Sequence, residues 1–387
     1  MLPEGWRRIK WGDAATLEYG KSLNDYKGKE GNTPVYGTNG LIGYTDKPLC
    51  HFPSVIIGRK GAYRGVHYSK SPFFVIDTAF YLKPIYEDLD IKFAYYQLLT
   101  QNINEMDSGS AIPSTSRNDF YNLDLVLPDL KSQQKISSIL SSLDDKIELN
   151  LKMNQTLEAI AQAIFKEWFI DFRFPGFDGE LVDGLPKRWR VGKVGEIADV
   201  IDCLHSKKPE RVSYDTGFIL LQLNNILDNG LLDLSDKFYI SQGDYQNWIS
   251  RIEISEGDCI ITNVGRVGSV ARIPALVKAA LGRNMTGIRP KENYPYPTFL
   301  VQLLVSNFMK TEIEKKKDFG TILDALNVKN IPKLSFHLPN IELISQFESI
   351  VSPMRSRMEN NVKENLTLSS IRDMLLPKLM TGKIRVA

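Results

Sequence analysis

The chain has 387 residues, of which 43% are hydrophobic and 24% charged, and its net charge is +2 at pH 7. This length allows two domains that each bury a core, and the composition is that of an ordinary globular protein. The chain lacks both a run of roughly 20 apolar residues and a secretory signal, so we expect no membrane partner and a cytoplasmic location.

Several motifs occur twice along the chain. Leu2-Pro3-Glu4-Gly5-Trp6 returns as Leu185-Pro186-Lys187-Arg188-Trp189, 183 positions later. The stretch from Gly109 into a long apolar-periodic segment returns from Gly320, 211 positions later. The interiors between these matched ends differ in length and sequence. We therefore expect two similar modules with different targets, and a partner with two non-identical half-sites, for which DNA is the obvious candidate.

Each module is predicted to be mixed α/β. We predict one helix in each, at 91–106 and at 298–313. Short apolar runs between glycine-rich turns predict strands. The predicted strands are 54–57, 73–76, 80–82 and 123–127 in the first module, and 218–221, 259–262, 270–273 and 285–288 in the second.

The candidate DNA contacts lie in polar, glycine-flanked turns. Residues 58–65 and 262–268 each follow an apolar strand, and residues 36–40 and 114–118 offer further polar tips. Glycine lets the backbone approach phosphates, and Arg or Asn can bond base edges in the major groove. An ordinary hairpin turn is the alternative for each turn taken alone. The predicted DNA-binding residues are Asn39, Arg59, Lys60, Tyr63, Arg64, Arg117, Asn118, Asn263, Arg266, Arg283 and Asn284.

Two segments carry the apolar repeat of a coiled coil. From Ile136 to Trp168 the repeat positions follow in alternating steps of four and three, and the pattern returns from Phe347 with Arg372 as its exception. Each segment predicts a helix roughly 50 Å long at 1.5 Å per residue. Pro353 and Pro377 predict kinks or fraying in the second helix.

Each repeat has an asparagine pair at its centre. Asn150 and Asn154 lie about the midpoint of the first repeat, and Asn361 and Asn365 about that of the second. If the helices pack antiparallel, Asn150 can meet Asn365 and Asn154 can meet Asn361. Buried asparagines in a coiled coil fix register and partner, which is the role we predict. The alternative is that they face solvent on a bent helix.

These elements predict an α+β fold with two mixed α/β domains related by duplication and separated by two long antiparallel coiled-coil helices. We expect the first domain at 1–130, the central helix and linker at 131–184, the second domain at 185–340 and the C-terminal helix at 341–387.

Motifs of catalysis and metal binding are missing from the sequence. It contains no GxxxxGK[ST] phosphate loop, no glycine-rich methyl-donor turn, and no histidines in a metal-ligand spacing. The cysteines Cys50, Cys203 and Cys259 are widely spaced and form no CxxC motif, which argues against a disulfide framework or a zinc site. We therefore expect a non-catalytic chain without a metal or cofactor of its own.

The ordered and duplicated motifs resemble those of the specificity subunits of type I restriction–modification enzymes. The resemblance covers essentially the whole chain, although the second module departs from it at Arg283-Asn284-Met285-Thr286. The motifs that carry it are the Leu-Pro-Glu-Gly-Trp motif and its repeat, Asp77-Thr78-Ala79-Phe80, Leu127-Pro128 leading into Gln133-Gln134-Lys135-Ile136, Leu376-Pro377-Lys378-Leu379-Met380-Thr381-Gly382 and Ile384-Arg385-Val386.

The resemblance implies two target-recognition domains that bind the halves of an asymmetric, bipartite sequence in double-stranded DNA. The helices would set the gap between the half-sites and help to dock two methyltransferase subunits, with two restriction (translocase) subunits completing the complex. S-adenosylmethionine, ATP and Mg would be bound by those partners, which methylate adenine N6 and cleave DNA. Two alternatives stay open: a free-standing bipartite DNA-binding or anti-restriction protein, and a coiled-coil adaptor that binds proteins.

Overall fold

The computed structural model describes residues 3–24, 26, 31–106, 113–318 and 324–386, so Leu2, Gly109 and Gly320 of the repeats lie outside the described residues. The chain forms two compact units, Met1–Lys146 with Leu368–Ala387 (unit 1) and Ile147–Thr367 (unit 2). Both units mix helices and strands, which confirms the predicted α+β class. The predicted boundaries at 130, 184 and 340 stay a prediction, because each long helix contributes residues to both units. No helix among the described residues is long and apolar enough to span a bilayer.

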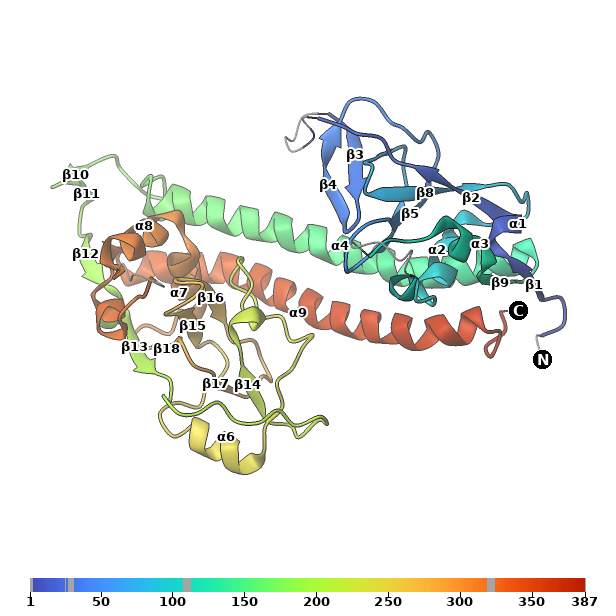
Figure 1. Ribbon diagram of the computed structural model, residues 1–387. Coiled ribbons are helices and arrows are strands. Elements are labelled where there is room, and N and C mark those ends of the chain that lie inside the picture. The colour runs from blue at the N-terminus through green and yellow to red at the C-terminus, as the bar shows by residue number, and fades with distance from the viewer. Residues whose placement is uncertain (1–2, 25, 27–30, 107–112, 319–323, 387) are drawn as a thin grey trace. The chain divides into compact units, whose positions relative to one another are not determined.

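The main sheet of unit 1 has the antiparallel strand order β2-β8-β5-β6. Its strands are β2 (Ala15–Tyr19), β5 (Ser54–Gly58), β6 (Val66–Ser69) and β8 (Ala79–Pro84). Helix α2 (Ile91–Leu99) packs on β5 and β6 (Figure 1). Every side chain of β5 is buried, so this strand is the centre of the module.

The other elements of unit 1 surround this sheet. A smaller sheet has the order β4-β3-β7, and β1 pairs with β9 in antiparallel fashion. The bounds are β1 (Arg7–Lys10), α1 (Trp11–Ala14), β3 (Thr33–Gly37), β4 (Gly40–Thr45), β7 (Phe74–Val75), the 3₁₀ turn η1 (Ile103–Glu105), α3 (Arg117–Asn122) and β9 (Asp124–Leu127).

The main sheet of unit 2 repeats the first one, with the antiparallel order β13-β18-β15-β16. Its strands are β13 (Ala198–Asp202), β15 (Cys259–Thr262), β16 (Val270–Arg272) and β18 (Met285–Pro290). The two modules therefore contain main sheets of matching order. The interiors differ, since the first unit adds the β4-β3-β7 sheet and the second a parallel β14–β17 pair.

The remaining elements of unit 2 surround its main sheet. The bounds are β10 (Leu181–Val182), β11 (Leu185–Pro186), β12 (Arg190–Lys193), α5 (Val194–Ile197), β14 (Ile219–Leu221), η2 (Leu223–Asn225), α6 (Gln242–Trp248), β17 (Ala279–Leu281), α7 (Pro297–Val305), α8 (Asn307–Lys316), η3 (Val328–Lys333) and β19 (Ser335–Leu338). Strand β12 pairs with β19 as β1 pairs with β9.

Neither predicted module helix is continuous over its expected length. The helix predicted at 91–106 ends at Leu99, and the one predicted at 298–313 is divided into α7 and α8. The division falls at Ser306, whose hydroxyl accepts the backbone N–H of Met309 at 3.1 Å. Serine favours this helix-capping position because its side chain satisfies an N–H that has no partner within the helix.

The two long helices are α4 (Leu130–Phe169) and α9 (Ile341–Met380), each of 40 residues. Helix α9 is assigned without interruption through Pro353 and Pro377, so the structure records no break at the prolines predicted to kink or fray it. The helices run antiparallel within each unit, where residues near the start of one contact residues near the end of the other.

In unit 2 the central asparagines meet across the helix pair. Asn361 Nδ2 donates to Asn154 Oδ1 at 2.8 Å, and Asn150 Nδ2 donates to Asn365 Oδ1 at 2.9 Å. Asn150 and Asn361 are fully buried and Asn154 is 4% exposed. The asparagines therefore do not all face solvent, and their role in fixing register stays a prediction.

A second kind of cross-helix contact is ionic. In unit 1, Arg372 donates to Asp144 at 2.8 Å, which explains why an arginine interrupts the apolar repeat. In unit 2, Arg355 is completely buried, lies 3.6 Å from Glu158, and donates to the carbonyls of Asn229 and Gly230. Burial lowers the pKa of Arg355. A buried charge needs such partners, because its desolvation is otherwise strongly unfavourable.

Candidate nucleic-acid interface

The predicted DNA-binding turns of the first module meet in the structure. The 58–65 turn follows β5, and its Arg59 carbonyl accepts the N–H of Thr115, in the turn at 114–118, at 2.9 Å. The turn at 36–40 joins them, because the Thr38 carbonyl accepts the N–H of Gly65 at 3.1 Å. Segments far apart in the sequence thus form one surface of polar loops.

An aromatic side chain organises the cations of this surface. Tyr19, at the end of β2, is 48% exposed, and its ring centre lies 5.0 Å from the Arg59 guanidinium and 5.1 Å from that of Arg117. Both distances are within the range of cation–π attraction. Sequence patterns alone did not identify Tyr19, because its importance depends on two loops that arrive from residues 40 and 98 positions later.

Cationic side chains lie close to Tyr19. Among the described residues, neither Arg59, Lys60 nor Arg117 has an acidic partner. His67 adds no charge near pH 7, because burial lowers the pKa of its imidazole. Cations without ion-pair partners on converging loops favour a polyanion as the ligand.

Arg64 does not belong to this exposed cluster. Its side chain is only 1% exposed and donates to the carbonyls of Gly61, Ile103, Asn104 and Met106. In this conformation the guanidinium holds the loop together and cannot reach a DNA base. The prediction of base contact at Arg64 therefore does not fit the structure.

The other predicted contacts of the first module are accessible. Asn39, Lys60, Tyr63 and Asn118 are exposed, and Tyr63 is exposed by 66%. Their contact with DNA stays a prediction.

The second module repeats the backbone bonds of the first. The N–H of Arg59 donates to Thr78 at 2.8 Å, and that of Asn263 donates to Asn284 at the same distance. A β-bridge joins Lys60 to Ser114, and another joins Val264 to Ala325. Asn263 therefore occupies the backbone position of Arg59.

The side chains in the matching turn of the second module differ from those of the first in exposure and in hydrogen-bond partners. Asn263 is 6% exposed and turns inward, where it donates to the Leu326 carbonyl and accepts from Thr286. Arg266 is more accessible, but it pairs with Asp228 and donates to the Ile226 carbonyl. Base contact at Asn263 does not fit this conformation, and at Arg266 it would have to displace existing partners.

Arg283 and Asn284 are exposed on the loop before β18. Asn284 has a φ of 65°, a left-handed conformation that asparagine tolerates better than most residues. These two residues are the accessible predicted contacts of the second module.

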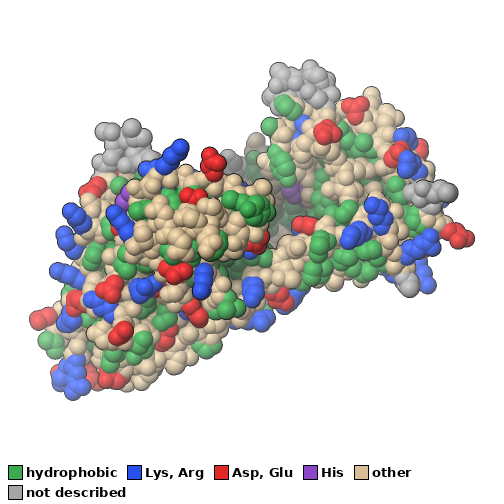
Figure 2. Space-filling view, turned by 90° about the horizontal axis from the view of Figure 1, so that it is seen from below, with side chains coloured by type: hydrophobic (Ala, Val, Ile, Leu, Met, Phe, Trp, Pro, Cys, Tyr) green, Lys and Arg blue, Asp and Glu red, His purple; other side chains and the backbone are tan. Residues whose placement is uncertain are grey.

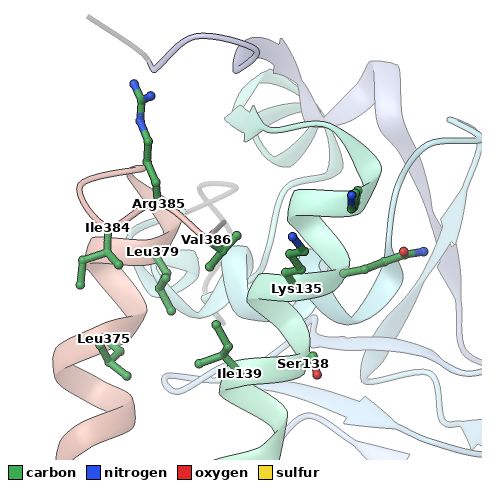
Figure 3. A pocket seen from close by; sticks show the side chains of 10 residues that line it. Lys135, Ser138, Ile139, Leu375, Leu379, Ile384, Arg385 and Val386 are labelled. Atoms are coloured by element: carbon green, nitrogen blue, oxygen red, sulfur yellow. The ribbon is translucent and has the colours of Figure 1, made fainter.

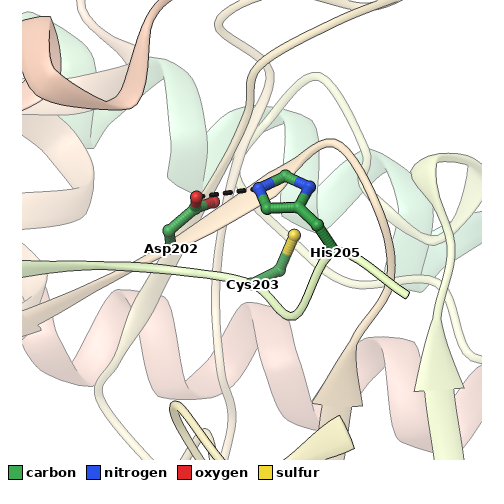
Figure 4. Close-up of side chains that lie close together, drawn as sticks. All are labelled: Asp202, Cys203 and His205. Atoms are coloured by element: carbon green, nitrogen blue, oxygen red, sulfur yellow. Dashed lines mark hydrogen bonds and ion pairs between the residues drawn. The ribbon is translucent and has the colours of Figure 1, made fainter.

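At the place of Tyr19 the second module has Asp202, since each ends the first strand of its sheet. The ligand atoms of Asp202, Cys203 and His205 lie within 4.8 Å of one another (Figure 4). His205 lies 2.8 Å and Arg251 3.6 Å from the Asp202 carboxylate, and burial raises the pKa of the Cys203 thiol. The carboxylate is thus paired with basic side chains, and the sequence spacing had not predicted the cluster.

Comparisons with known proteins agree with this architecture. Residues 3–159 match the family model of the type I restriction modification DNA specificity domain. The chain is 27% identical over 306 residues to the MjaIX specificity subunit of Methanocaldococcus jannaschii, which covers 76% of this chain and 69% of that relative. It is 25% identical over 343 residues to the HindI specificity subunit of Haemophilus influenzae, with 73% of each chain covered.

Residues 3–159 thus match a type I specificity domain, and most of the chain is similar to the specificity subunits of type I restriction enzymes. A solved S subunit from M. genitalium shares the fold, with a TM-score of 0.65, 18% identity, and coverage of 97% of this chain and 96% of that one.

Cations and acids are mixed over the surface of this chain. On the face shown in Figure 2, Lys and Arg side chains are interspersed with Asp and Glu, in keeping with the net charge of +2. The convergence of loops, rather than an overall field, therefore concentrates cations around Tyr19.

A groove of about 590 Å³ lies between α4 and α9 in unit 1 (Figure 3). Its apolar part is formed by Ile139, Leu375, Leu379, Ile384 and Val386, and its basic side chains are Lys131, Lys135 and Arg385. The groove offers an apolar surface bordered by cations on the helices.

Proposed function

We propose that this chain is the sequence-specific DNA-binding subunit of a type I restriction–modification complex. Each module binds one half of an asymmetric, bipartite site in double-stranded DNA. The observation that carries this proposal is the repeated loop scaffold with different side chains, in which Arg59 and Asn263 share a backbone position but differ in exposure and partners. A duplicated scaffold of this kind suits two half-sites of different sequence.

The chain itself performs no chemistry in this proposal. Two methyltransferase subunits dock on it and transfer the methyl group of S-adenosylmethionine to adenine N6, and two restriction subunits use ATP and Mg to translocate and cleave DNA. Because a target adenine must leave the stack to be methylated, the specificity subunit holds the duplex while its partners act. Helices α4 and α9 set the gap between the half-sites.

Binding of the full chain to random duplex DNA tests the DNA-binding proposal. We expect affinity to fall steeply as salt rises, with a log–log slope of about −0.9 for each phosphate neutralised. Fluorescence anisotropy at several salt concentrations measures this slope. A chain with no salt-dependent DNA binding would instead support the coiled-coil adaptor.

A further inference from the structure

We propose that Tyr19, Arg59 and Arg117 form a guanine-recognition centre in the first module. Arg59 donates two hydrogen bonds to O6 and N7 of one guanine in the major groove. Arg117 contacts a backbone phosphate, and Tyr19 holds both guanidiniums in place. This inference rests on the proposed DNA-binding function and deepens it by assigning a base to one half-site.

The position of Arg59 is fixed from several sides. Its backbone N–H donates to the Thr78 carbonyl at 2.8 Å, and its side chain donates through Nη1 to the Asp77 carbonyl at 3.0 Å. Its guanidinium lies against the rings of Tyr19 and Phe80, at 5.0 and 5.8 Å. A side chain held in this way loses less conformational entropy on binding than a free arginine.

The bonds that fix Arg59 leave its recognition edge available. The side-chain hydrogen bond that the structure describes for Arg59 uses Nη1, so Nε and Nη2 keep two parallel donors on one edge. Guanine presents two acceptors, O6 and N7, side by side in the major groove, and arginine matches them in a bidentate contact. This geometry favours guanine over the other bases.

In Arg117, by contrast, the edge formed by Nε and Nη2 is already occupied. Its Nε and Nη2 both donate to the hydroxyl of Tyr121, at 3.2 and 2.8 Å, and this bond raises the pKa of Arg117. The bidentate edge is therefore engaged within the protein. What Arg117 offers a ligand is a positive charge with single donors, which suits a phosphate oxygen and carries no sequence information.

The second module lacks this arrangement at the matched positions. Asn263 stands in the backbone position of Arg59 with its side chain turned inward, and Asp202 stands in the place of Tyr19. A carboxylate, here paired with His205 and Arg251, offers no aromatic ring against which a guanidinium could be held. The recognition centre should consequently contribute guanine to the half-site of the first module alone.

Substitution by lysine tests the centre, because lysine keeps the charge and loses the planar fork. Full-length variants are compared with the wild type by selection from duplexes that carry randomised sequence, and thermal melting verifies folding. In Arg59→Lys we expect the guanine preference at one position of one half-site to fall at least about 10-fold, with the other half-site unchanged.

Arg117→Lys should retain the wild-type motif, because a lysine also contacts phosphate. Arg117→Ala should lower the affinity for all DNA sequences alike. It should also reduce the slope of log affinity against log salt concentration by about 1. Tyr19→Ala should lose the guanine preference and should also bind all DNA sequences more weakly. Lys83→Ala, which removes an exposed cation from β8, is the matched control and should leave motif and salt slope unchanged.

The outcomes separate the two levels of the proposal. A wild-type chain that selects no interrupted motif overturns the DNA-binding function, and the recognition centre with it. A wild-type motif without guanine, or an Arg59→Lys variant that keeps the guanine preference, overturns the recognition centre and leaves the DNA-binding function standing.

Discussion

Arg59 and Arg64 belong to the same glycine-flanked turn, yet the fold uses them in different ways. Arg59 lies against the Tyr19 ring, whereas Arg64 is buried among backbone carbonyls. Those carbonyls come mainly from η1 and the residue that follows it, Met106. One turn thus contains an arginine that lies against an exposed ring and an arginine that stabilises the loop.

Replacing Arg64 with alanine should destabilise unit 1. Removal of the guanidinium leaves several buried carbonyls without a donor, and each unsatisfied group costs about 1–3 kcal/mol. We expect the free energy of unfolding to fall by about 3 kcal/mol in chemical denaturation. Tyr63→Ala, on the same turn but 66% exposed, is the control and should change it by less than about 0.5 kcal/mol. If Arg64→Ala is as stable as the wild type and selects a different DNA motif, the prediction that Arg64 contacts a base would be supported instead.

The sequence indicated the exposed turns of the candidate site, but it did not indicate which of their side chains face outward. Glycine-flanked turns after apolar strands indicate exposed loops, and the structure brings the turns at 36–40, 58–65 and 114–118 together. Whether an arginine in such a turn faces outward depends on carbonyls about 40 residues away, as for Arg64. A local sequence pattern contains no information on contacts between residues so far apart in the chain. Tyr19 was not identified for the same reason, because its neighbours Arg59 and Arg117 come from distant segments.

The long helices combine two kinds of polar contact. The asparagine pairs are alike in α4 and α9, so they cannot by themselves distinguish an α4–α9 pair from a pair of identical helices. The ion pairs can, because α4 supplies the acids Asp144 and Glu158 whereas α9 supplies the bases Arg372 and Arg355. Pairing α9 with a second α9 would oppose cations, which penalises the wrong partner.

Replacing both asparagine pairs with leucine should raise stability and loosen specificity. Leucine at Asn150, Asn154, Asn361 and Asn365 removes polar groups that are mostly buried, while the polar contacts that fix the register are lost. We expect a melting temperature higher by about 2–4 °C for each kcal/mol gained, together with slipped or oligomeric forms. Calorimetry and light scattering measure the two effects. A protein that is less stable and assembles as before would contradict the register role.

At this scale the sequence was most informative where periodicity is long. The steps of four and three predicted two helices of about the observed extent, and Arg372 marked a true exception because it forms an ion pair. The shorter module helices were predicted less well: α2 ends at Leu99, and the second helix is interrupted at Ser306, where a side-chain hydrogen bond caps a new helix.

For the whole molecule, the central feature is that α4 and α9 each contribute to both compact units. Each unit holds one module and its own stretch of both helices. Our account makes the helices the determinant of the gap between two half-sites. A heptad inserted in each helix adds about 10 Å, close to the rise of three base pairs.

Mapping of N6-methyladenine by long-read sequencing tests this account most directly. The chain is expressed with its partner methyltransferase in a methylation-free host, beside a variant with one heptad inserted in each long helix. We expect an interrupted motif with one methylated adenine on each strand, and in the variant the same half-sites with a longer gap. An uninterrupted motif, or half-sites that change when the helices are lengthened, would contradict it.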